Sequence, residues 1–257
     1  MTDHAYPTSL AEIESWSRAH KVPVHQARIR FMEFVILERL ASNRELRNGI
    51  VLKGGNALRF AYQGCRSTKD LDFTVVDDDQ AVPDNEEDLV KVGYIFSNDK
   101  HFHNFEERNV SDVVPLEISF GDMVCEKKPL KLVEHETSRL MVCSLEDIIA
   151  EKLRALLQQP VRKRDRTQDV YDIARCRQQF ADKLDLSKIA DFLLRKSSIR
   201  TDIEVRKSRF DNEIRDMAKA GSAYDKMIAD QAAAYPINFD VAWNEVLTLV
   251  QSLDIPE

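Results

Sequence analysis

The sequence predicts an α+β protein in which a mixed α/β half is followed by a helical half. Strand-like apolar runs cluster before about residue 140, whereas apolar residues recur at three- and four-residue spacing after about residue 144. The length of 257 residues allows one large domain or two small ones with a real core. We therefore expect an α/β domain over residues 1–140 and a helical domain over residues 141–257.

The composition is that of an ordinary soluble globular protein. Only 7 Gly and 8 Pro argue against a loop-rich all-β fold, and no apolar run is long enough to span a membrane. The N-terminal residues lack a basic region followed by an apolar run, so we expect no signal peptide and a cytoplasmic protein. The four cysteines contain no CxxC pair and are interpreted as reduced thiols, not as a disulfide framework or a zinc site.

The charge is distributed unevenly along the chain. The net charge of −7 argues weakly against a general nucleic-acid binder. Residues 77–88 carry seven carboxylates and no base, which predicts a solvated loop. Residues 151–218 carry seventeen Lys+Arg against twelve Asp+Glu, so the helical half can present a basic face.

The first half alternates helices and strands. The expected elements are a helix over 24–46, a strand over 50–52, a helix opening at Asn56, a strand over 67–76 and a strand over 113–120. In the second half, Ser144 followed by Asp147 is a capping box that opens a helix, and Pro160 is expected to stop it. Further helices are expected over 166–180, within 186–232 and over 238–253.

A glycine pair follows the first strand directly. In Lys53-Gly54-Gly55 the strand turns straight into a helix, which places free backbone N–H groups at a helix N-terminus. Because glycine has no Cβ, a phosphate can approach this turn closely. The alternative is a tight turn that simply needs glycine, since neither GxxxxGK[ST] nor GxGxxG is present.

Three acidic residues are expected on one face of two strands. Asp70 and Asp72 alternate with the apolar Leu71 and Phe73, so both carboxylates point away from the core. Glu117 alternates with its own apolar neighbours in the same way. Hard oxygen ligands in such a set suit one or two Mg²⁺ ions, as phosphoryl transfer requires. The alternative is that these are ordinary solvent-facing strand residues.

Lys152 falls near the middle of the apolar stripe of its helix, while Glu151 and Arg154 are expected on the outside. A lysine that points inward must snorkel, pair with an acid or meet an anionic ligand.

The next helix also places charged residues on its apolar stripe. Arg166 and Arg177 fall on its inner stripe, Asp169 flanks that stripe, and Asp172 is expected to point outward. An interhelical ion-pair network is the alternative to a ligand site.

Five segments together resemble a known family. VLKGGNALRF, RSTKDLDF, LEISF, EKLRALLQQ and RTQDVYDIAR occur in this order within about residues 30–180. The chain resembles the AbiEii/AbiGii-type nucleotidyltransferase toxins of bacterial toxin–antitoxin systems. The resemblance implies the DNA-polymerase-β-like nucleotidyltransferase fold, with a nucleotidyltransferase domain over 1–140 and a helical domain over 141–257 that completes the active cleft. Asn56 stands where a small hydroxyl residue is common in the family.

The resemblance also implies roles for single residues. Gly54 and Gly55 would cradle the NTP triphosphate, Asp70 and Asp72 would bind the metal with Glu117 as third acid, and Lys152 and Asp169 would be the lysine and aspartate of the later motifs. Asp70, Asp72, Lys152 and Asp169 are thus the expected catalytic residues. Lys53, Arg66 and Arg166 are added as phosphate contacts, and Ser67 and Lys152 as nucleotide contacts.

The function implied is Mg²⁺-dependent transfer of NMP from an NTP to an acceptor, with a cognate antitoxin as partner. The 3′ end of tRNA is the expected acceptor, and a protein is the alternative. Two alternatives stay open: a small-molecule nucleotidyltransferase of the antibiotic-modifying type, and a nucleotide- or antitoxin-binding module without turnover. His101, His103 and Cys65 are weaker candidates, more simply interpreted as loop or packed residues.

Overall fold

The chain forms two compact units. The computed structural model describes residues 6–64, 66–68, 70–76, 87–93, 113–132, 139–199 and 202–257. The first unit consists of Met1–Gln63, Lys69–Asp122 and Lys128–Val142, and the second of Gly64–Thr68, Met123–Lys127 and Cys143–Glu257. The second unit thus takes two short segments from within the sequence of the first.

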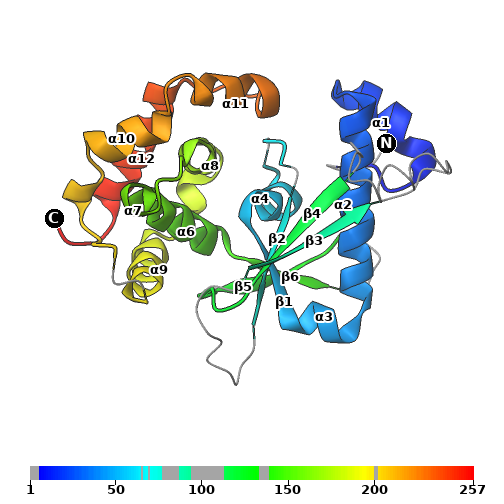
Figure 1. Cartoon of the computed structure of the whole chain (residues 1–257), viewed down its shortest axis with the longest axis horizontal. Coiled ribbons are helices and arrows are strands. Elements are labelled where there is room, and N and C mark those ends of the chain that lie inside the picture. The colour runs from blue at the N-terminus through cyan, green and yellow to red at the C-terminus, as the bar shows by residue number, and fades with distance from the viewer. Residues whose placement is uncertain are drawn as a thin grey trace. The chain divides into compact units, whose positions relative to one another are not determined.

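The strands join in one mixed sheet, which Figure 1 shows with its helices. The strands are β1 (Ile50–Lys53), β2 (Leu71–Val75), β3 (Glu87–Gly93), β4 (Val113–Ser119), β5 (Lys127–Leu130) and β6 (Leu140–Cys143). They lie in the order β3-β4-β2-β1-β6-β5. β2 pairs antiparallel with β1 and parallel with β4, so it occupies the interior of the sheet. Leu71 and Phe73 of β2 are fully buried, as their alternation predicts.

Among the described residues, the helices of the first unit are α1 (Ile13–His20), α2 (Val24–Ser42), α3 (Arg44–Gly49) and α4 (Gly54–Tyr62). The single helix expected over 24–46 is wrong, because the chain turns extended at Asn43. The side chain of Asn43 accepts a hydrogen bond from the Leu46 amide at 3.1 Å and so caps α3. α4 begins at Gly54, two residues before the expected Asn56.

The described elements of the second unit are helical. They are α6 (Leu145–Leu157), α7 (Gln159–Arg162), α8 (Thr167–Phe180), α9 (Leu186–Ser198), α10 (Asn212–Lys219), α11 (Ala223–Gln231) and α12 (Phe239–Ser252). α6 packs against α8 and α9, and α8 packs against α12. The Ser144 hydroxyl accepts from the Asp147 amide at 3.1 Å, which confirms Ser144 as the N-cap. The reciprocal half of the expected capping box is wrong, because the Ser144 amide donates to the Glu126 carbonyl at 2.9 Å instead of to the Asp147 side chain. α6 ends before Pro160, which lies in the first turn of α7, where its missing N–H costs nothing.

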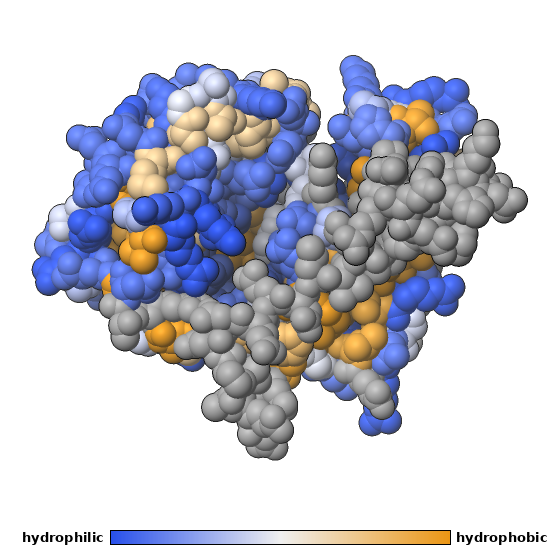
Figure 2. All heavy atoms as spheres, viewed as in Figure 1, coloured by the Kyte–Doolittle hydropathy of each residue, from blue (hydrophilic) through white to orange (hydrophobic). Residues whose placement is uncertain are grey.

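The α+β fold class is confirmed. The face of the second unit seen in Figure 2 is mostly hydrophilic, with apolar residues in small groups. Among the described helices, none has the length and apolar character that crossing a membrane requires. Glu87 and Asp88 open β3, so the solvated loop expected over 77–88 is wrong at its last two residues. The rest of that loop, together with Cys65, His101 and His103, lies outside the described residues.

Candidate active site

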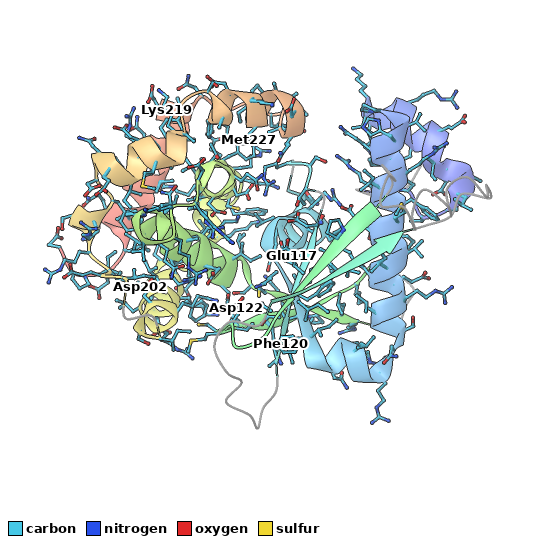
Figure 3. The ribbon with its side chains drawn as sticks, in the orientation of Figure 1. Glu117, Phe120, Asp122, Asp202, Lys219 and Met227 are labelled. Carbon is cyan, nitrogen blue, oxygen red and sulfur yellow. The ribbon has the colours of Figure 1, made fainter. Side chains whose placement is uncertain are left out.

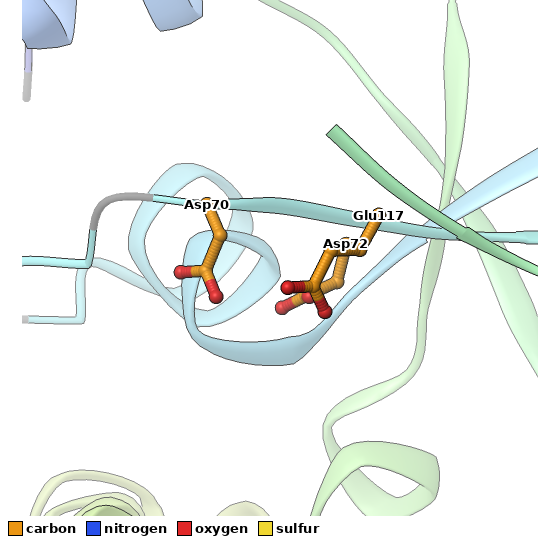
Figure 4. Close-up of side chains that lie close together, drawn as sticks. All are labelled: Asp70, Asp72 and Glu117. Atoms are coloured by element: carbon orange, nitrogen blue, oxygen red, sulfur yellow. The ribbon is translucent and has the colours of Figure 1, made fainter. Parts of the chain in front are cut away.

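Adjacent strands bring three carboxylates together. Asp72 of β2 lies opposite Glu117 of β4 in the parallel register, and residues directly opposite point to the same face of a sheet. Asp70 precedes Asp72 by two residues and shares this face. The ligand oxygens of Asp70, Asp72 and Glu117 all lie within 4.8 Å of one another, and Figure 4 shows the three side chains gathered on one side of the strands. We call these residues the acidic cluster.

The donor set of the acidic cluster fits Mg²⁺. Carboxylate oxygens are the hard ligands that this ion takes, and two oxygens on opposite sides of one Mg²⁺ lie about 4.2 Å apart. A spread of at most 4.8 Å is therefore close to that of a ligand set. Glu117 is exposed, and Asp70 and Asp72 are half-buried, so a dissolved ion can reach the cluster.

Gly54 lies directly against the acidic cluster. Its φ of +70° is favourable for glycine and strained for other residues. A Cβ at this position would stand 2.1 Å from Oδ2 of Asp72 and 2.9 Å from its Cγ. The turn between β1 and α4 therefore needs glycine both for its conformation and for the space that Asp72 occupies. This close approach joins the glycine turn and the acidic cluster into one site.

Lys53 points to the same face as Asp72, its partner in the antiparallel register. Its ammonium group donates to the Ser119 hydroxyl at 2.6 Å and forms an ion pair with Asp122. Glu117 lies on β4 and Asp122 just beyond its end (Figure 3). A cation with an internal counterion is thus held beside the acidic cluster.

A second group of charges is buried between α6 and α8 of the second unit. Lys152 donates to Asp169 at 2.7 Å and lies 2.8 Å from an oxygen of Asp172. Arg66 binds both oxygens of Asp172, from Nε and Nη2, at 3.0 Å each. We call Arg66, Lys152, Asp169 and Asp172 the ion-pair network.

The ion-pair network holds Lys152 and Asp172 in their charged forms. Burial alone would lower the pKa of Lys152, but Asp169 and Asp172 outweigh burial and raise that pKa. Burial would likewise raise the pKa of Asp172, yet Arg66 and Lys152 lower it to about 2. Of the three arrangements expected for an inward-pointing lysine, the structure shows the pairing with acids.

The sequence matches the family described as "Nucleotidyl transferase AbiEii toxin, Type IV TA system" over residues 35–245. The chain belongs to the AbiEii family. It is a nucleotidyltransferase toxin of a type IV toxin–antitoxin system, for which membership implies an NTP substrate and an antitoxin partner. A comparison with curated proteins gives no match.

Solved structures support the fold of this AbiEii protein. The nucleotidyltransferase toxin MenT4 of Mycobacterium tuberculosis H37Rv is similar with a TM-score of 0.62 and 15% identity, over 96% of this chain and 91% of that one. JHP933 of Helicobacter pylori is similar with a TM-score of 0.50 and 18% identity, over 85% of this chain and 90% of that one. The nucleotidyltransferase fold expected from the resemblance is confirmed.

Two outward orientations expected for the AbiEii helices are wrong. Asp172 is 4% exposed because it pairs with both Lys152 and Arg66. Arg154 is 8% exposed, since its guanidinium donates to Glu151 on the same helix and, at 2.6 Å, to Gln158, the C-cap residue of that helix. In both cases hydrogen-bonding partners outweigh the position on the helical wheel.

The remaining predicted contacts lie in the second unit. Arg66 also donates to Gln231 at 3.1 Å, and the Ser67 amide donates to the Gln231 carbonyl at 2.8 Å. Arg166 is partly exposed and lies 3.9 Å from Asp169. The assignment of these residues, of Lys152 and of Asp169 to nucleotide binding or catalysis stays a prediction, as does the assignment of Lys53, Gly54 and Gly55.

Sequence reasoning missed several polar residues near the acidic cluster. Asp122 carries no motif signal and follows its strand by three positions. Glu33 and Arg59 form a buried ion pair between α2 and α4. A charged residue inside an apolar helical pattern was the available signal for Glu33, since its neighbours Phe31, Met32 and Phe34 are apolar.

Proposed function

We propose that this AbiEii protein is a Mg²⁺-dependent enzyme that transfers NMP from an NTP to the 3′ end of a tRNA. The observation that carries the proposal is the acidic cluster, built directly against the glycine turn at Gly54. Phosphoryl transfer needs carboxylates that hold a metal ion and, beside them, a turn whose backbone N–H groups can bind a phosphate. A toxin that consumes NTP and modifies tRNA acts in the cytoplasm.

In this proposal Asp70, Asp72 and Glu117 hold the metal ion. A bound Mg²⁺ would supply positive charge against the α-phosphoryl oxygens and the pyrophosphate leaving group. Gly54 and Gly55 would hold the terminal phosphates through backbone N–H groups at the start of α4.

The reaction exchanges one bond to phosphorus for another. A hydroxyl oxygen of the acceptor attacks the α-phosphorus, and the bond from this phosphorus to the bridging oxygen breaks, so pyrophosphate leaves. The acceptor proton must be removed in the same process, and Asp169 is the proposed base. Lys152 is proposed to fix the nucleotide.

The surface charge supports a polyanionic acceptor. Arg162 ends α7, Lys163 and Arg164 follow it before α8, and all three are exposed. Exposed cations of one sign attract phosphate backbones, whereas a cationic drug would be repelled by them.

The test is an acceptor assay. The purified protein is incubated with each of four labelled NTPs and Mg²⁺, in parallel with total RNA, with total protein and with a panel of aminoglycosides. We expect label in the tRNA fraction with one preferred NTP, and none with Asp72→Ala or with EDTA. The exposed acid Asp191 provides the matched control, because Asp191→Ala removes a carboxylate far from the acidic cluster in the sequence. Label in the drug fraction alone would replace tRNA by a small molecule, and label that persists in Asp72→Ala would contradict the metal site.

A further inference from the structure

Three buried polar side chains of the first unit form a group that contacts the acidic cluster at the main chain of Asp70. Glu33 on α2 and Asn56 on α4 are 0% exposed, and Arg59 on α4 is 3% exposed. Buried polar and charged groups are costly unless their hydrogen bonds are satisfied, so a buried trio calls for a reason.

One amide connects this trio to a proposed metal ligand. Nδ2 of Asn56 donates to the backbone carbonyl of Asp70 at 2.5 Å and to Oε1 of Glu33 at 3.4 Å. The other carboxylate oxygen of Glu33 forms an ion pair with Arg59. The two hydrogens of the amide thus link the buried ion pair to the main chain at Asp70. Oδ1 of Asn56 finds no hydrogen-bond partner among the described residues. The two hydrogen bonds that the Nδ2 group donates therefore determine the orientation of the Asn56 side chain.

The two aspartates of the acidic cluster differ in how the sheet supports them. Asp72 has a strand partner on each side, Lys53 on β1 and Glu117 on β4. The paired register of β2 with β4 begins only at Leu71, so Asp70 lies just before the ladder. The sheet fixes Asp72, whereas the Asn56 hydrogen bond reaches Asp70 at the point where the ladder stops.

We propose that Asn56 is a positioning residue that fixes the main chain at Asp70 and so holds the Asp70 carboxylate at ligand distance from the rest of the acidic cluster. Glu33 and Arg59 back Asn56 by holding its amide in one orientation. A metal site needs its ligands within about 0.5 Å of the productive geometry, and the hydrogen bond from Asn56 restrains the main chain that carries one of these ligands. The proposal rests on the metal site of the proposed function and adds the element that orders it.

The test measures Mn²⁺ binding by the full-length protein, from the EPR signal of the free ion and without nucleotide. Loss of a partner that orients a metal ligand typically weakens metal affinity about 10- to 100-fold, and we expect Asn56→Ala to do so. Asn56→Thr nearly keeps the side-chain volume but cannot reach both acceptors, so we expect an intermediate loss. In nucleotide transfer, both variants should need more Mg²⁺ for half-maximal rate and recover in part at high Mg²⁺.

Leu58→Ala is the matched control. Leu58 is buried on the same helix, so its truncation lowers stability without removing the hydrogen bond from Asn56 to Asp70. The folded control should bind Mn²⁺ as the wild type does.

Each outcome decides one question. If Asp72→Ala binds Mn²⁺ as tightly as the wild type, the proposed metal site itself fails. If Asp72→Ala loses the ion while both Asn56 variants bind it normally, the metal site stands and the positioning role is overturned. If neither Asn56 variant folds although Leu58→Ala does, Asn56 serves the stability of the fold and the positioning role is again overturned.

Discussion

The acidic cluster and the ion-pair network both gather charged side chains, but they follow opposite rules. The acidic cluster brings three carboxylates within 4.8 Å of one another, and one of them is exposed. The ion-pair network alternates two bases with two acids, and its side chains are at most 12% exposed. The formal charges of the acidic cluster add up to a net negative charge near solvent, whereas those of the ion-pair network add up to zero in the interior.

The difference indicates what each cluster is for. Two carboxylates about 4.8 Å apart repel by about 1–3 kcal/mol, depending on the local dielectric, and a bound cation removes this cost. The buried ion-pair network is neutral and needs no bound ion, but the loss of any member would leave an uncompensated charge. By charge sum and exposure, the acidic cluster needs a bound cation, whereas the charges of the ion-pair network are balanced by its own members.

The largest effect is expected from Gly54→Ala, which introduces a methyl group directly against the acidic cluster. The new Cβ would collide with the carboxylate of Asp72 at 2.1 Å, so Asp72 must leave its position. A displacement of about 1 Å can cost 100-fold in rate, and we expect nucleotide transfer to fall by at least about that factor. Steady-state transfer assays on the folded variant measure it.

Gly221→Ala separates collision from backbone strain. Gly221 also has a positive φ, +59°, but a Cβ there would meet nothing within 4 Å. It should lose some stability and keep its activity per folded molecule. Equal activity losses in the two variants would mean that strain, not the approach to Asp72, explains the glycine.

Lys152→Met breaks the ion-pair network at its centre. Methionine suits an apolar stripe, but here it leaves Asp169 and Asp172 buried without the lysine. Removing one partner from a buried ion pair costs about 3–5 kcal/mol of unfolding free energy, which urea unfolding measures. Lys188→Met, at an exposed pair with Glu126, should leave the unfolding midpoint nearly unchanged. If both variants unfold at the wild-type midpoint, the ion-pair network has no structural role.

Acid should weaken the same network. The pKa of Asp172 is lowered from 3.8 to about 2 in the folded protein. Its contribution to stability is therefore present above pH 4 and is lost as the pH falls from about 4 to about 2, by about 2 kcal/mol. In a pH series of urea unfolding, Asp172→Asn should show a shallower decline over this window, while Asp191→Asn keeps the wild-type slope. A parallel decline in all three proteins would contradict the assignment.

The smallest effect concerns a third set of charges, the exposed run Arg162, Lys163 and Arg164. Its members share one sign and meet solvent, so it resembles the acidic cluster more than the ion-pair network. Replacing all three with Gln should reduce the log–log salt slope of RNA binding by about 0.7–0.9 per lost phosphate contact, with NTP affinity unchanged. Gln at the exposed Arg206 and Arg209 is the control. An unchanged slope would remove this run from the acceptor surface.

Strand patterns predicted the acidic cluster well, because a period of two fixes which side chains share a face. The shared face of Asp70 and Asp72, and the outward position of Glu117 on its own strand, follow from that rule. The parallel pairing of β2 with β4 then brings the three together. Helical wheels did less well. The wheel of α8 places Asp172 outward, but cations from α6 and from Gly64–Thr68 draw it inward.

Long-range contacts account for the other omissions. The contact from Asn56 to the Asp70 carbonyl joins α4 to the start of β2, and no local pattern encodes it. The break at Asn43 is a local feature that the sequence could have indicated, since asparagine is a good N-cap and residues 42–45 are polar.

The division of the chain also constrains how such toxins can evolve. Gly64–Thr68 and Met123–Lys127 belong to the helical unit although they lie within the sequence of the sheet unit. Arg66 is held there by Asp172, and the amides of Cys125 and Glu126 by the carboxylate of Asp147. A recombination event at Val142–Cys143 would therefore import a helical part that does not fit these two inserted segments. Domain exchange by a single crossover is disfavoured, and the two units are expected to be inherited together.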